Sequence, residues 1–163
     1  MKVPANENEI TLYCLVGEAI WKIQAVEQAL SCSITLKMNP AATKEQADKV
    51  LKQHQSYTLG MAVNIASREK LYESSLQDEL YTFLNLRNWL VHKAMAESHH
   101  DKNWENEKEE LFGKIKSISD KAESIQHKIE YDMISFCSSK GKDMSKILEL
   151  LKLQEQGVRV KKA

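Results

Sequence analysis

The chain of 163 residues contains few helix-breaking residues, with five glycines and two prolines, the prolines both lying towards the N-terminus. Because Ala, Leu, Glu, Lys and Gln are abundant, this composition indicates an all-helical protein. The three cysteines are an odd number, widely spaced and without a CxxC pair, so neither a disulfide framework nor a zinc knuckle is expected. We therefore expect the chain to fold in a reducing compartment.

Long apolar runs and an excess of one charge are also missing. The N-terminal segment lacks the apolar core of a signal peptide, and no run approaches the roughly 20 apolar residues that cross a bilayer. Basic and acidic residues number 23 each, so any site for a polyanion must be local; only the C-terminal stretch leans basic. We expect a cytoplasmic protein with no membrane partner.

Hydrophobic periodicity predicts an antiparallel, up-and-down bundle of four to five helices. The expected helices cover residues 7–31, 43–65 and 74–97, then a long helix with an apolar seam from Leu111 to Phe136, and finally residues 144–154. Capping-box patterns mark the starts at Thr43 and Ser74. Residues 1–139 are expected to form the bundle, and residues 140–163 a short C-terminal helix and basic tail of the same single domain.

The third expected helix places a permanent cation in an apolar stripe. The stripe, at three- and four-residue steps, consists of Leu76, Leu80, Leu84, Arg87, Val91 and Ala94. Because a guanidinium keeps its charge, Arg87 must be paired with a carboxylate or face a cleft that holds an anion. A neighbouring stripe contains Tyr81, Asn85, Asn88 and His92. We therefore expect one sector of this helix to combine a cation, two carboxamides and an imidazole, which suits phosphate chemistry.

The segment Arg87-Asn88-Trp89-Leu90-Val91-His92 resembles the R-polar-x(3–5)-H motif of the HEPN superfamily, small helical-bundle proteins that are often ribonucleases. The flanking Leu86 and Lys93 extend the likeness to prokaryotic members. The resemblance implies a HEPN-like bundle that acts as an endoribonuclease without metal or other cofactor. It also implies a homodimer with a composite active site, and a toxin in a toxin–antitoxin or phage-defence system. Some family toxins carry a Tyr, modified by a partner antitoxin, where this chain has Ala94, so that mode of silencing is not expected.

The residue types fit such a reaction. RNA carries its own nucleophile, the 2′-hydroxyl beside the phosphate. His92 can act as general acid or base, and the Arg87 guanidinium can hold two phosphate oxygens in a fork. Asn88 can orient the imidazole or donate to the phosphate, and a dimer supplies two histidines, one for each proton transfer. The candidate catalytic residues are therefore Arg87, Asn88 and His92, and the candidate substrate-binding residues are Tyr81, Asn85 and Lys93.

Structural roles for the same residues are open alternatives. Arg87 can pair with Asp78, Glu79 or a carboxylate on another helix, such as Glu18. His92 can complete a polar network in the core. The protein is then a catalytically silent HEPN-like module that binds a protein partner or senses a nucleotide or RNA.

Several other residues have simpler expected roles. His54 lies on an apolar stripe and is expected in the core. The segment His99-His100-Asp101 can bind a metal together with His92, but a solvated turn is the expectation, and no metal site is predicted. Trp89 and Trp104 can stack on bases, with packing or a dimer contact as the favoured alternative. The cysteines Cys14, Cys32 and Cys137 are expected to be small buried hydrophobes.

Overall fold

The computed structural model describes residues 4–39, 43–97 and 104–158, with side chains given from residue 107 in the last range. Every regular element in these ranges is a helix, which confirms the all-α prediction. The helices are α1 (Glu7–Met38), α2 (Lys44–Gln55), α3 (Leu59–Arg68), α4 (Ser74–His92), α5 (Ala94–Glu97), α6 (Trp104–Ser139) and α7 (Ser145–Glu155). None of the described helices is both long enough and apolar enough to span a bilayer.

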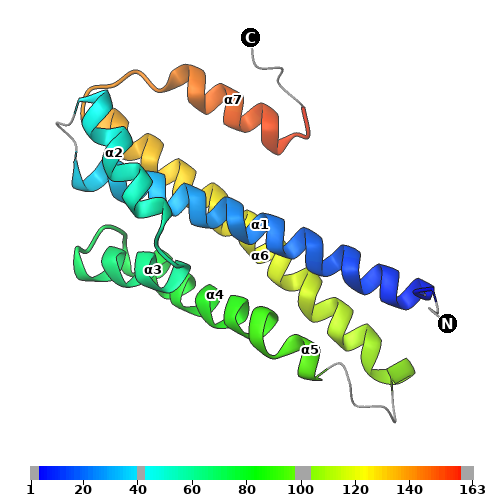
Figure 1. Ribbon diagram of the computed structural model, residues 1–163. Helices are drawn as coiled ribbons and strands as arrows, with labels where there is room; N and C mark the ends of the chain where they lie inside the picture. The colour runs from blue at the N-terminus through cyan, green and yellow to red at the C-terminus, as the bar shows by residue number, and fades with distance from the viewer. Residues whose placement is uncertain (1–3, 40–42, 98–103, 159–163) are drawn as a thin grey trace.

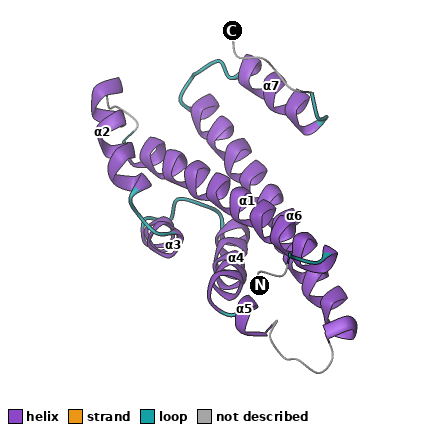
Figure 2. Cartoon of the chain, turned by 45° about the vertical axis from the view of Figure 1, so that its right-hand side comes forward, coloured by secondary structure: helices purple, strands orange, loops and turns teal. Residues whose placement is uncertain are grey.

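Helices α1 and α6 form the central pair of the bundle. The layer of α3, α4 and α5 lies below this pair and α7 lies above it in both views (Figures 1 and 2). The two central helices run in the same direction, because Lys22 pairs with Glu123 at 2.9 Å while Lys37, further along α1, pairs with Asp132, further along α6. The expectation of a bundle that is antiparallel throughout is therefore wrong for α1 and α6.

Helix α4 runs opposite to both. Lys128, late in α6, pairs with Glu79, early in α4, at 2.6 Å, while Lys114, early in α6, covers the ring of Trp89, late in α4. The direction of α6 follows from a break in the expected second helix. Residues 43–65 form two short helices rather than one long one, so neither crosses the full length of the bundle. Helix α4 is therefore the first long helix that runs antiparallel to α1.

A single hydrophobic core joins α1, α3, α4 and α6. The predicted seam of α6 is confirmed, since its central residues are fully buried and Leu111 and Met133 pack against the core at partial exposure. Phe136, the last residue of the seam, is half-buried. The fully buried large side chains of this core include Leu30, Ile34, Leu59, Val63, Leu80, Phe83, Ile118 and Ile125. The sequence predicts this seam because the apolar period is sustained over many helical turns.

Helix α1 extends past its expected end at residue 31 and reaches Met38. The polar residues Ser31, Ser33 and Thr35 suggested a connection, yet all three are buried. The Thr35 hydroxyl donates to the Ser31 carbonyl at 2.8 Å and lies 2.7 Å from Nδ1 of His54 in α2, while the Ser33 hydroxyl accepts from Tyr72 at 2.7 Å. These buried polar groups are therefore satisfied by hydrogen bonds.

Helix boundaries elsewhere follow the capping chemistry. Thr43 forms the predicted capping box with Gln46, whereas Thr58 caps α3 after a break, so the expected helix 43–65 divides before Gly60. The second predicted box is wrong, because α4 begins after Glu73 and has no side-chain cap. A break at Lys93 separates α5 from α4. The expected polar break at residues 99–103 lies outside the described residues.

Candidate functional site

The buried face of α4 contains Arg87 but differs from the predicted stripe at its apolar positions. Phe83 and Leu90 are buried there, whereas Leu84 is half-buried and Val91 is 45% exposed. Arg87 lies between Phe83 and Leu90 on the face that packs against the bundle. Its side chain is 26% exposed, so the guanidinium lies at the edge of the core rather than within it.

Of the described carboxylates, that of Glu27 in α1 pairs with Arg87. Arg87 Nη2 lies 3.8 Å from Glu27 Oε1, and Nη1 donates to Asn88 Oδ1 at 3.3 Å. Nε is buried and has no hydrogen-bond partner among the described residues. Of the pairings left open by the sequence, the one with a carboxylate on another helix is found, but with Glu27 rather than Glu18. Glu79 instead binds Lys128, and Glu18 binds Lys22. The guanidinium is thus placed beside an anion but is not saturated by it.

Glu27 is a site residue that the sequence did not reveal. Burial raises its pKa, and the nearby positive charge of Arg87 opposes that rise. The available signal was its position in α1, one residue after the buried Val26 and three before the buried Leu30. A carboxylate at the edge of an apolar stripe needs a partner, but nothing in the sequence specifies which helix supplies it.

The second predicted stripe of α4 is exposed along its length. Tyr81, Asn85, Asn88 and His92 all face solvent, as does Lys93 at the C-cap. At 100° of rotation per residue, His92 lies about 140° around the helix from Arg87. One copy of the chain therefore does not bring the Arg87 and His92 side chains into a single sector, contrary to the expectation.

An apolar strip occupies the arc of α4 between Arg87 and His92. Val91 on this arc is 45% exposed, Leu84 is half-buried beside Gly60 of α3, and Met95 continues the strip on α5 at 75% exposure. The strip is therefore bordered by Arg87 on one side and by Asn88 and His92 on the other. This arrangement combines apolar surface with polar groups at its rim, which is the composition of a protein interface.

Trp89 lies on the opposite side of the polar stripe and has a structural role. Its Nε1 donates to Glu97 Oε2 at 2.7 Å, and Lys114 Nζ lies 3.5 Å from the ring centroid. Trp89 of α4 thus contacts both α5 and α6 and stabilises the packing of the three helices. Because Lys114 covers one ring face, base stacking on that face is excluded.

The remaining candidates fall into three groups. His54 is confirmed as a core residue, with burial lowering its pKa. Cys14 is exposed, contrary to expectation, and Cys32 and Cys137 are half-buried. Among the described residues, no group of three or more His, Cys, Asp or Glu side chains is arranged to hold a metal ion. His99, His100, Asp101 and the side chain of Trp104 lie outside the described residues.

Comparison of the chain with family models, with curated proteins and with solved structures finds no match. The function must therefore be inferred from the residues themselves.

Proposed function

We propose that the chain is a HEPN-like, metal-independent endoribonuclease, and that it is the toxin of a toxin–antitoxin or phage-defence system. The observation that carries the proposal is the incomplete pairing of Arg87. Within the described part of the chain, its one ion pair spans 3.8 Å and its one side-chain hydrogen bond goes to the adjacent Asn88. The exposed His92 ends the same helix. A purely structural arginine is expected to have its donors satisfied.

The reaction requires two proton transfers and stabilisation of charge. One His92 accepts the proton of the RNA 2′-hydroxyl, whose oxygen attacks the adjacent phosphorus. The bond from phosphorus to the 5′-oxygen breaks, and this oxygen takes a proton from a second His92. The products are a 2′,3′-cyclic phosphate and a free 5′-hydroxyl, while Arg87 stabilises the negative charge on the phosphorane oxygens.

The second histidine comes from a second copy of the chain. Pairing of two copies through the apolar strip buries Val91 and Met95, and it lines the rim of the shared interface with both motif sets. A dimer also allows Arg87 and His92 to act at one site although they are separated within one copy, because residues about 140° apart on one helix can border the same interface.

The proposal is tested with purified protein, a single-stranded RNA and EDTA. We expect wild type to cut the RNA and leave cyclic phosphate ends, and Arg87→Lys and His92→Ala to lose at least about 100-fold in rate. Arg68→Lys and His127→Ala are matched controls, since each alters the same residue type at an ion pair elsewhere on the bundle. Wild type that leaves RNA intact, or activity that requires a divalent ion, would contradict the mechanism.

A second candidate function is a catalytically silent helical module that binds protein through α1, and the outer face of α1 favours it. Ile10, Tyr13 and Trp21 are 52%, 65% and 76% exposed, and Gly17 lies between them with open space around it. Tyr13 and Trp21 each lie four residues from Gly17. An antiparallel second copy centred on Gly17 would therefore set each Trp21 against the partner copy's Tyr13.

The two candidates predict different interfaces. A Gly17→Cys variant should form an intermolecular disulfide under mild oxidation if copies pair through α1, and a Val91→Cys variant should do so if they pair through the apolar strip. Both are made in a chain whose exposed Cys14 is replaced by Ser. Gly113→Cys, at another exposed helical glycine with open space, is the control for random collision.

A further inference from the structure

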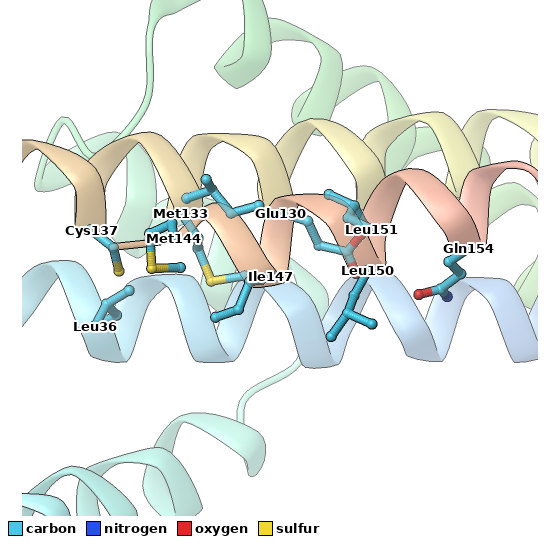
Figure 3. A pocket seen from close by; sticks show the side chains of 10 residues that line it. Leu36, Glu130, Met133, Cys137, Met144, Ile147, Leu150, Leu151 and Gln154 are labelled. Carbon is cyan, nitrogen blue, oxygen red and sulfur yellow. The ribbon is translucent and has the colours of Figure 1, made fainter. Parts of the chain in front are cut away.

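A cavity of about 360 Å³ lies between α7 and the central helices, away from the motif on α4. Figure 3 shows its lining side chains converging between α6 and α7 over the end of α1. The lining is mainly apolar and includes Leu36, Met133, Cys137, Met144, Ile147 and Leu151. This volume and this composition are in the range of small-molecule sites.

Two polar side chains, Glu130 of α6 and Gln154 of α7, also line the cavity. Glu130 Oε1 accepts a hydrogen bond from Gln126 at 2.8 Å, whereas Oε2 is buried and has no hydrogen-bond partner among the described residues. A buried carboxylate oxygen without a donor is costly. The cavity therefore combines an apolar lining with one negatively charged side chain, that of Glu130.

We propose that this cavity binds a small amphiphilic primary amine, with its alkyl or aryl body among the apolar side chains and its ammonium group donating to Glu130. The amine supplies a positive charge beside the Glu130 carboxylate, and Gln154 offers an amide oxygen as a further acceptor. Met133 and Met144 are unbranched and adapt to ligands of different shape.

Helix α7 is suited to admit such a ligand. Among its apolar side chains, Leu151 is buried, but Ile147 and Leu150 remain 50% and 43% exposed although they line the cavity. Its far end is held by Glu155, which accepts from the Tyr131 hydroxyl at 3.1 Å and lies 3.7 Å from His127 Nδ1. A helix held by one buried leucine and one polar cluster can move outward without opening the main core.

The test uses the full chain labelled with ¹³C-methyl methionine and three probes of equal length: n-octylamine, 1-octanol and octanoate. We expect octylamine to shift the Met133 and Met144 signals saturably and to leave those of the exposed Met61 and Met95 unchanged. Octanoate should bind at least about tenfold more weakly than octylamine, because its charge meets that of Glu130.

Glu130→Gln keeps the size of the side chain and removes its charge. It should weaken octylamine binding about tenfold and leave octanol binding unchanged. Glu149→Gln, an exposed position of α7 that does not line the cavity, should bind as wild type does. Equal affinity for the three probes, shifts of the same size at all four methionines, or no saturable shift would each overturn the proposal.

Discussion

Replacing Arg87 and Glu27 by Gln, singly and together, separates a functional arginine from a structural one. The two charges are 3.8 Å apart, a distance at which the Coulomb energy is about 1 kcal/mol in water and about 4 kcal/mol at an effective dielectric of 20. Both side chains are partly exposed, at 26% and 31%, and no hydrogen bond joins them. Screening therefore favours the lower end, and we expect a coupling energy of about 0.5–1 kcal/mol.

The assay is urea unfolding of wild type, Arg87→Gln, Glu27→Gln and the double variant, followed by circular dichroism at neutral pH. The coupling energy is the amount by which the sum of the two single-variant losses exceeds the loss of the double variant. A value above about 2 kcal/mol would identify a buried ion pair whose breaking leaves an uncompensated charge, and would refute the view that Glu27 leaves Arg87 available for phosphate.

Three further outcomes are expected. Phe83→Ala should lower the free energy of unfolding by about 3–5 kcal/mol and Tyr81→Ala by about 0.5 kcal/mol or less; similar losses would contradict the rotational setting of α4. Burial lowers the pKa of His54, so below its ordinary value of 6.5 the unfolded chain binds a proton that the folded chain does not, and stability falls as the pH falls. His54→Gln should reduce that loss in urea titrations at successive pH values, and an unchanged pH slope would contradict this assignment. Val91→Glu should give a folded, inactive monomer by light scattering, and a strictly monomeric wild type that still cuts RNA would argue against the shared interface.

The all-helical class and the α6 seam could be predicted from the sequence because they depend on local composition and on a period repeated over many turns. The end of α1 could not. Ser31 and Ser33 have the local character of a connection. Only tertiary contacts, with His54 of α2 at Ser31 and with Tyr72 at Ser33, make them part of a buried helix. The parallel direction of α1 and α6 could not be predicted from the sequence either, because it follows from the break before Gly60 and not from any feature of these two helices.

In the candidate site, too, local features could be predicted from the sequence and tertiary contacts could not. That Tyr81, Asn85, Asn88 and His92 share one face follows from helical spacing, but their exposure is decided by how α4 packs against the bundle. The partner of Arg87 is a tertiary contact between helices far apart in sequence, so Glu27 had no local signature that would link the two. Spacing alone also misassigned the apolar positions, since Phe83 and Leu84, like Leu90 and Val91, are adjacent and only packing decides which of each pair is buried.

Mixing wild type with His92→Ala tests the shared site most directly. If both histidines of a dimer serve one cleft, a mixed dimer with a single His92 is inactive, and only dimers of two wild-type copies cut RNA. At equal amounts of the two chains, after exchange of subunits, about a quarter of the wild-type activity should remain. The same experiment with the control His127→Ala should leave activity unchanged. A fall to one half, in simple proportion to the wild-type fraction, would show that each copy acts alone and would contradict the composite site.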